Sequence, residues 1–258
     1  MSETVRTRAG GDRGDARGGG GRVGGVLSGL AVALGCLLFL GGFVWGAVLY
    51  QPYTVPTDSM SPTVEAGARV LAQRIDGSEV KRGDVVVFKE ALWGDMPMVK
   101  RVVGIGGDKV AGAGGRLTVN GRPIDEPYLR SKDAGMGQEF SVTVPDGKLF
   151  LLGDERRNSM DSRVHLQEAG QGSVPRSAVT GRVDAIAWPM DGVLERPTGF
   201  AALPGGISEP GPVRLVVAAI VGGAALILVG AAYGPLARLA GRRGSGGRSR
   251  REEEAVAA

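Results

Sequence analysis

The sequence is poor in the two residue types that most often build metal and redox sites. Its 258 residues include one cysteine, Cys36, and one histidine, His165. A single cysteine excludes an intramolecular disulfide and a cysteine-ligated metal cluster, and a single histidine excludes zinc motifs that need a histidine pair. The run GIGGDKVAGAGG also lacks the Gly-x-Gly-x-x-Gly spacing of a dinucleotide-binding turn. We therefore expect neither a metal nor a cofactor.

The middle of the chain has no surplus of positive charge. The sequence holds 31 basic and 27 acidic residues, but five Arg against three acidic residues lie in 1–23, and six Arg against three Glu lie in 234–258. The remainder carries 20 basic and 21 acidic residues. This balance argues against a core that binds nucleic acid, whereas basic tails are typical of segments beside a membrane.

A long apolar run lies near the start of the chain. Residues 23–50 form 28 consecutive positions without a charge, and about 20 suffice to cross the hydrocarbon core of a bilayer as a helix. We expect a transmembrane helix over 24–50, with Trp45 and Tyr50 toward its outer end. A cleaved signal peptide is the alternative, but its apolar region usually has only about 7 to 15 residues and ends in a small-x-small site, which is missing here.

A second apolar run lies near the end of the chain. Residues 215–237 are 23 uncharged positions between Arg214 and Arg238, and we expect a transmembrane helix over 213–235. A buried helix of a soluble domain is the competing interpretation. Because both tails are rich in Arg, the positive-inside tendency predicts two spans with both termini in the cytoplasm. The polar tails, 1–23 and 236–258, are expected to be disordered, and 199–212 is expected to be a linker to the membrane.

The segment between the apolar runs has the pattern of a β protein. Over 51–198, short β-rich runs alternate with turn residues, and no stretch has a helical period. Asn120-Gly121 within LTVNGRPI is the preferred two-residue hairpin turn, and 133–137 is expected to be a loop. We predict a compact antiparallel β domain. Its clearest strands are Arg69–Arg74, Asp84–Phe88, Met98–Ile105, Arg116–Val119, Lys148–Leu152 and Arg182–Ala187.

Three polar clusters interrupt this pattern: VPTDSMSPT around Ser59, VKRVVGIGGD around Lys100, and GDERRNSMDSR over 153–163. A lysine in a strand is usually solvated, but alternation places Lys100 on the same face as the apolar Met98 and Val102, so it could point into the core. Burial would lower the pKa of its amine, and a neutral amine is a usable general base. Such a base could activate a serine without histidine.

Spacing alone does not identify that serine, since serines are common in turns. However, VPTDSMSPT, RGDVVVF, KRVVGIGGD and GDERRNSMDSR resemble, in order and spacing, the conserved boxes of the bacterial type I signal peptidases. The resemblance covers about residues 30–190 and includes the apolar segment before the serine box. It implies a membrane-bound Ser-Lys endopeptidase, with a largely β domain, that removes signal peptides from exported preproteins in the cell membrane of a bacterium.

The resemblance also implies roles for individual residues. Ser59 would be the nucleophile and Lys100 the general base, while the Thr57 hydroxyl and the Ser59 N–H would stabilise the oxyanion. In the last box, Ser159 would orient the lysine, and Asp161 and Arg163 would form a supporting ion pair. Four residues beside the catalytic pair match positions that line the substrate pocket: Tyr53, Val55, Met98 and Val99. Without the resemblance, the last box would be a solvated loop and these four would be ordinary core residues.

Two residues depart from the family pattern. Asp58 stands where many members have a small residue, and Glu155 replaces the usual Asn after Gly-Asp. We expect His165 to be a surface residue without a role in activity. The self-cleaving repressors share the Ser-Lys pair, but they carry a DNA-binding helical domain. A membrane-anchored scaffold, or a pseudo-peptidase that binds exported chains without cutting them, remains the non-enzymatic alternative; the sequence leaves the oligomeric state open.

Overall fold

The structure is a computed structural model that describes residues 19–94, 96–130 and 138–233. The chain divides into two compact units. One comprises the described residues up to Phe43 and those from Ala218 onward, and the other is Val44–Val217. The expected loop at 133–137 and most of both expected disordered tails lie outside the described residues.

Two long apolar helices account for the two uncharged runs. Helix α1 comprises Gly19–Leu49 and therefore begins earlier than the expected start at residue 24. The second helix comprises Val213–Tyr233. Their apolar stretches, Gly24–Leu49 and Val213–Tyr233, are long enough to cross a bilayer, and only 11% and 17% of their most apolar windows is buried within the protein. A core helix of a soluble domain would be mostly buried, so the exposure favours membrane helices.

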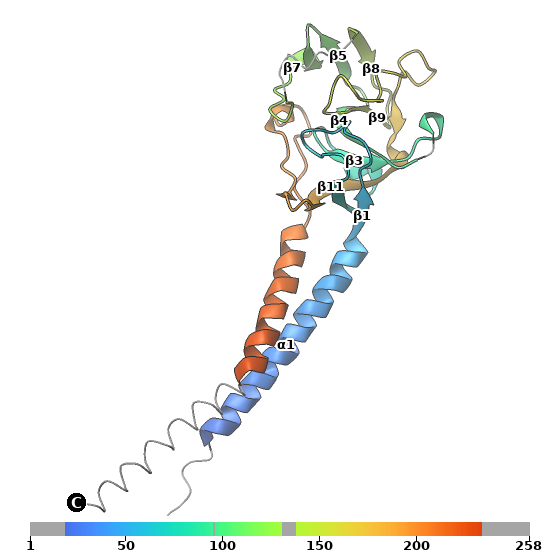
Figure 1. Ribbon diagram of the computed structural model, residues 1–258. Helices are drawn as coiled ribbons and strands as arrows, with labels where there is room; N and C mark the ends of the chain where they lie inside the picture. Colours follow the sequence, from blue (N-terminus) through green and yellow to red (C-terminus); the bar gives the residue numbers. More distant parts are fainter. Residues whose placement is uncertain (1–18, 95, 131–137, 234–258) are drawn as a thin grey trace, which may run out of the picture. The chain divides into compact units, whose positions relative to one another are not determined.

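The unit Val44–Val217 consists of β-strands joined by turns and short 3-10 helices, and every strand pair described is antiparallel (Figure 1). The strands are β1 (Tyr50–Thr54), β2 (Arg69–Gln73), β3 (Val85–Phe88), β4 (Met98–Ile105), β5 (Lys109–Ala113), β6 (Arg116–Val119), β7 (Arg122–Pro123), β8 (Phe140–Thr143), β9 (Lys148–Leu152), β10 (Val174–Pro175), β11 (Val179–Trp188) and β12 (Gly192–Val193). The 3-10 helices are η1 (Gly77–Glu79), η2 (Ala91–Trp93), η3 (Arg176–Ala178) and η4 (Thr198–Phe200).

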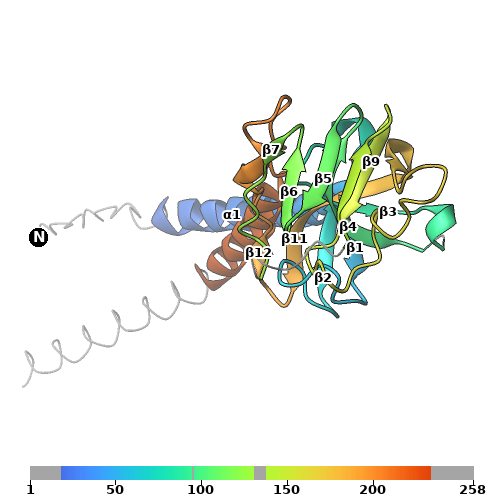
Figure 2. The ribbon, with the colours of Figure 1, turned by 90° about the horizontal axis from the view of Figure 1, so that it is seen from above.

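These strands form two sheets. The larger has the order β1-β2-β11-β3-β4-β9-β10, with β12 paired to β11, and the smaller has the order β7-β6-β5-β8 (Figure 2). Strand alternation assigns successive side chains to different clusters: Leu149 and Leu151 of β9 belong to one buried cluster, while Phe150 and Leu152 belong to another that also contains residues of the smaller sheet. The antiparallel β domain predicted from the sequence is thus confirmed.

The predicted strands agree with the observed ones, with small differences at the ends. Three of them, over 98–105, 116–119 and 148–152, have the predicted bounds, and β11 extends beyond the predicted 182–187 at both ends. Asn120 and Gly121 join β6 to β7 with φ of 54° and 75°, which are the positive values that a type I′ hairpin turn requires. Strands β1, β5 and β8 were not predicted.

The segment that leads to the second helix is attached to the β domain by buried polar groups. Asp184 of β11 is fully buried and accepts hydrogen bonds from the Gly211 N–H at 3.0 Å and from the Tyr50 hydroxyl at 3.3 Å. It also pairs with Arg182 and Arg196. A buried carboxylate needs such partners, so this one side chain ties β1, β11 and the expected linker 199–212 together.

Candidate active site

Ser59 lies where the chain leaves β1 and turns. The Val55 N–H donates to Ala68 O at 2.9 Å, which extends the β1–β2 pairing up to the serine box, and the Ser61 N–H closes a turn on Asp58 O at 2.8 Å. The Ser59 side chain is buried. Its backbone N–H donates to no acceptor in the described part of the chain. The turn therefore holds the hydroxyl inside the domain and leaves an N–H unused beside it.

Lys100 contacts Ser59 from strand β4 of the larger sheet. It is a residue of β4 and pairs with Val86 of β3. Its amine donates to Ser59 Oγ at 2.7 Å and to Val99 O at 3.2 Å. The predicted burial of this lysine is confirmed, since only 5% of the residue is exposed. Two residues far apart in the sequence are thus within hydrogen-bonding distance, as proton transfer requires.

The surroundings of Lys100 favour a neutral amine. Burial lowers the pKa of Lys100 from its ordinary 10.5 to about 8, although the negative charges of Asp161 and Asp154 oppose the shift. The cause is desolvation, which disfavours the charged form. With a pKa near 8, an appreciable fraction of the amine is unprotonated close to neutral pH and can accept a proton from a hydroxyl.

Thr57 lies beside the hydroxyl of Ser59. Its Oγ1 is 3.2 Å from Ser59 Oγ, and the residue is exposed. A hydroxyl and a backbone N–H on the same side of a nucleophile can together stabilise the negative oxygen of a tetrahedral intermediate.

Strand β9 places the last box, residues 153–163, next to Ser59. Gly153 and Asp154 follow this strand, whose Leu152 pairs with Arg101 of β4. The Glu155 N–H donates to Ser59 O at 3.1 Å. An ideal Cβ on Gly153 would lie 2.5 Å from Ser59 O and 2.1 Å from Ser159 Oγ. Only glycine allows the two loops to approach so closely.

Asp161 and Arg163 form the expected ion pair at 2.8 Å. Asp161 also accepts from the Gly153 N–H at 3.0 Å. Burial raises the pKa of the Asp161 carboxyl, but hydrogen bonds and charge attraction from Arg163 outweigh burial and hold the pKa below its ordinary value. The Ser159 hydroxyl also lowers this pKa. Within the described part of the chain, however, the buried Ser159 Oγ has no hydrogen-bond partner of ordinary geometry. A bond from Ser159 to Lys100 is therefore not formed.

A cavity of about 200 Å³ opens beside Ser59 and Lys100. Its apolar lining includes all four expected pocket residues, Tyr53, Val55, Met98 and Val99. Thr57 also borders it, as do Val87, Trp93, Met96 and the two prolines Pro56 and Pro97. A cavity of this size admits small side chains next to the hydroxyl.

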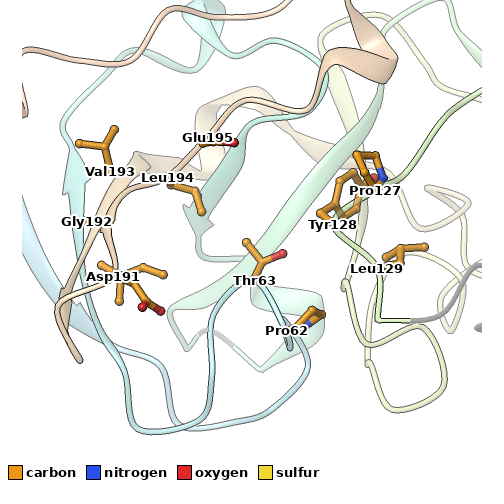
Figure 3. Close-up of a pocket in the computed structure, with 11 residues that line it drawn as sticks. Pro62, Thr63, Pro127, Tyr128, Leu129, Asp191, Gly192, Val193, Leu194 and Glu195 are labelled. Atoms are coloured by element: carbon orange, nitrogen blue, oxygen red, sulfur yellow. The ribbon is translucent and has the colours of Figure 1, made fainter.

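A larger hollow, of about 360 Å³, lies elsewhere on the domain (Figure 3). Figure 3 shows it between the turn at Pro62 and Thr63, the segment with Pro127 and Tyr128, and the segment from Gly192 to Leu194. Neither Ser59 nor Lys100 lines it. The smaller cavity is therefore the one that belongs to the candidate active site.

The two departures from the family pattern are accommodated without crowding the reactive atoms. The carboxylate of Asp58 is exposed and accepts from the Asn158 amide at 3.1 and 3.2 Å. Glu155 contributes its backbone N–H to Ser59 O, and a backbone group is available whichever side chain stands there. Neither carboxylate has a hydrogen bond to Ser59 or Lys100 among those described.

The expectation that His165 lies at the surface is wrong. The residue is 8% exposed, and its ring stacks on that of Trp93 with centroids 4.4 Å apart and planes 9° apart. Its Nδ1 lies 2.6 Å from Glu168 Oε1. The residue is not at the surface because the indole of Trp93, in η2, covers one face of its ring.

The sequence analysis missed a buried ionic network beside Lys100. Arg101 is fully buried, donates to both oxygens of Asp154 at 2.8 and 2.6 Å, and stacks over the Tyr128 ring at 3.9 Å. Arg156 pairs with Glu126 at 2.6 Å. The sequence feature that could have revealed this network is Arg101 directly after Lys100. Because side chains alternate along a strand, two adjacent basic residues cannot both lie on its outer face.

In the described part of the chain, no three or more His, Cys, Asp or Glu side chains are grouped so that they could hold a metal ion. Ser59 and Lys100 are placed for the transfer of a proton from a hydroxyl to an amine, followed by nucleophilic attack.

The sequence was also compared with known proteins. The family described as "Signal peptidase, peptidase S26" matches residues 27–188. Signal peptidase I S of Bacillus subtilis is 36% identical over 154 residues, which cover 55% of this chain and 79% of that protein. A probable signal peptidase I of Mycobacterium leprae is 32% identical and covers 54% of this chain and 68% of that one. A crystal structure of a signal peptidase I from Enterococcus faecalis is 30% identical, with a TM-score of 0.34, and covers 40% of this chain and 95% of that one.

Proposed function

The chain belongs to the signal peptidase I family of serine peptidases, and from this premise we propose that it cleaves signal peptides from exported preproteins with Ser59 as nucleophile and Lys100 as general base. The observation that carries the proposal is the distance of 2.7 Å between Lys100 Nζ and Ser59 Oγ at a buried amine. An amine whose pKa is lowered by desolvation can, in its neutral form, replace the histidine of other serine peptidases.

The reaction proceeds through an acyl-enzyme. Neutral Lys100 accepts the proton of Ser59, and Oγ attacks the carbonyl carbon of the last signal-peptide residue. The Thr57 hydroxyl and the Ser59 N–H donate to the negative oxygen. When the intermediate collapses, Lys100 returns the proton to the leaving amine of the mature protein. Water then gives a proton to Lys100 and attacks the carbonyl carbon of the ester. As the bond from this carbon to Ser59 Oγ breaks, Lys100 returns the proton to Oγ, and the signal peptide leaves as a carboxylic acid that ionises in water.

Ser159, Asp161 and Arg163 support this pair indirectly. The Asp161–Arg163 ion pair and the hydrogen bond from the Gly153 N–H to Asp161 hold the last box together, and the Glu155 N–H joins the box to Ser59 O. The carboxylate of Asp161 raises the pKa of Lys100, against the larger effect of burial, so it keeps the amine more basic than burial alone would. Ser159 lies next to Gly153 in the same box, without a hydrogen bond to Lys100.

The substrate binds as an added strand with small side chains beside the nucleophile. Backbone hydrogen bonds supply affinity in this mode of recognition, and pockets for alternate side chains supply specificity. The cavity of about 200 Å³ lined by Tyr53, Val55, Met98 and Val99 lies beside the nucleophile, where the side chains of the added strand would enter. We therefore expect cleavage after a small-x-small sequence.

The membrane helices keep the enzyme beside its substrate. A signal peptide that awaits cleavage is itself in the bilayer, so a bilayer-anchored Ser59 meets it at a raised effective concentration. The Arg-rich tails favour a topology with both termini in the cytoplasm of a bacterium and the β domain outside. The proposed partners are therefore preproteins that carry a signal peptide and the lipid bilayer.

The experiment that tests the proposal is cleavage of a secretory precursor by the purified, detergent-solubilised protein, beside its Ser59→Ala and Lys100→Ala variants. The new N-terminus is identified by mass spectrometry. We expect cleavage after a small-x-small site by the parent only, with a loss of activity of at least about 1000-fold in each variant. Binding of precursors without cleavage by all three proteins would contradict the proposal and support the pseudo-peptidase or scaffold.

A further inference from the structure

The only histidine of the chain is a neighbour of the cavity wall. His165 follows the last box, and its backbone N–H donates to Ser162 O at 3.3 Å. Its ring lies nearly parallel to that of Trp93, and Trp93 lines the cavity beside Ser59 and Lys100. The histidine itself does not line this cavity, so any influence on a substrate passes through the indole.

Trp93 packs against a buried apolar cluster that contains Phe88, and its ring also contacts His165, which lies outside that cluster. It ends the three-residue helix η2, and its neighbour Leu92 is exposed. One face of the indole lies on His165, and the indole meets Phe88 edge to face with centroids 5.6 Å apart. A stacked aromatic pair contributes more than its buried area alone. The imidazole therefore supports one face of this part of the cavity wall.

His165 is itself held in place. Its Nδ1 and Glu168 Oε1 are 2.6 Å apart, and the Glu168 N–H donates to His165 O at 3.0 Å. The Ser162 hydroxyl accepts from the Leu151 N–H at 2.9 Å, so the segment before the ring is fixed to β9. An imidazole with its plane set by a partner and its backbone tied to the sheet gives a stationary surface for the indole.

We propose that His165 is a positioning residue for substrate selection: its stacking on Trp93 fixes the indole as a wall of the cavity and thereby excludes large side chains from the site next to Ser59. The inference rests on the proposed function, since it concerns which residues of a preprotein are accepted. The removal of one wall contact enlarges or loosens the cavity without altering the distance from Lys100 to Ser59, so recognition changes and the chemical step does not.

The test compares cleavage of matched precursors that carry Ala or Leu at the last position of the signal peptide, or two positions before it. In His165→Ala we expect the ratio of kcat/KM for Leu over Ala to rise by about 2- to 10-fold at one of these positions, as the loss of a stacking contact would give. For the Ala precursor, KM should rise and kcat should stay within about twofold of the parent. His165→Phe keeps a ring of similar size and should restore the parent ratio.

A double-mutant cycle shows whether the effect passes through the indole. Trp93→Ala should change the ratio in the same direction, and His165→Ala should add nothing in that background, because coupled residues are not additive. Glu168→Ala leaves the His165 ring in place but removes its hydrogen-bond partner, so it should change the Leu/Ala ratio less. This variant replaces His165→Ala in the test if His165→Ala does not fold. Phe140→Leu, which disrupts the stacked pair with Phe150 in another buried cluster, is the control for lost stability and should leave the ratio unchanged.

Each result either supports or overturns the positioning role of His165. An unchanged ratio in His165→Ala, additive effects in the cycle, or the same change in Phe140→Leu overturns the inference. Those results leave the proposed function intact as long as the parent cuts and Ser59→Ala does not. A parent protein that cuts no precursor overturns both.

Discussion

At the scale of single residues, Lys100 determines how activity depends on pH. Its pKa is lowered to about 8 by burial, and only the neutral amine can accept the proton of Ser59. Below pH 8 the amine is protonated, so kcat/KM should fall by about tenfold for each further unit of pH. Above pH 8 it should reach a plateau. The measurement is the pH profile of kcat/KM on one precursor between pH 6 and 10.

The control for this profile is Lys100→Arg. A guanidinium stays protonated throughout this range, so the variant should be inactive at every pH, including those at which the parent is on its plateau. A flat parent profile from pH 6 to 9, or recovery of the arginine variant at high pH, would mean that Lys100 is not the base.

Gly153 tests how closely the last box must approach the nucleophile. In Gly153→Ala, the added Cβ would lie 2.5 Å from Ser59 O and 2.1 Å from Ser159 Oγ, so the loops must separate. We expect kcat to fall at least about tenfold, since a small misplacement of reacting groups is costly. Gly170→Ala, where the nearest atoms would be 3.5 Å away, is the matched control and should keep full activity. Equal activity of the two variants would contradict this account.

The residues of the reactive pair, its pocket and its ion pair were predictable, but other neighbours of the site were not. Ser59 and Lys100 stand in recognisable boxes, and strand alternation allowed for the burial of Lys100. The stacking of His165 on Trp93 could not be predicted, because a single sequence does not say which distant loop covers a residue. The same holds for Gly153, whose requirement for glycine comes from the close approach of another loop.

At the scale of elements, β4 is buried almost throughout and carries two adjacent basic residues. Arg101 and Asp154 are both fully buried and paired. In Arg101→Met, the Asp154 carboxylate loses its partner inside the protein, and we expect the free energy of unfolding to fall by about 3–5 kcal/mol. Adding Asp154→Asn removes the unpaired charge and should recover part of the loss. Urea unfolding of the detergent-solubilised protein measures both.

The outcome that would contradict this account is a double variant no more stable than Arg101→Met. It would mean that the arginine contributes by its packing over the Tyr128 ring and not by neutralising the carboxylate. The parent and Asp154→Asn alone complete the cycle, and the coupling between the two sites is the quantity of interest.

The elements themselves followed from the sequence where patterns were strong. Alternation and the Asn120-Gly121 turn predicted β6 and its hairpin. Strand β5, KVAGA, was missed because its small residues give little β signal, and it forms by pairing with β6 and β8 on both sides. The extension of β11 likewise comes from pairing with β2, β3 and β12, partners that local sequence does not reveal.

At the scale of the whole molecule, charge predicts the orientation in the membrane. Both tails are rich in Arg, and the residues between the two apolar helices are close to neutral. We expect a membrane-impermeant maleimide to label Arg116→Cys, an exposed position in β6, in intact cells. It should label Ser245→Cys only after the membrane is permeabilised. Both variants carry Cys36→Ser, so that the introduced thiol is the only one.

The position of Ser245 makes the experiment sensitive to the second helix in particular. If Val213–Tyr233 spans the bilayer, the tail lies on the opposite side from the β domain, and the two labels must differ. If both cysteines are labelled in intact cells, that helix does not cross and the tail lies outside. If neither is labelled until permeabilisation while a control outer protein reacts, the β domain faces the cytoplasm, where no signal peptide emerges to be cut, and the proposed function fails with the topology.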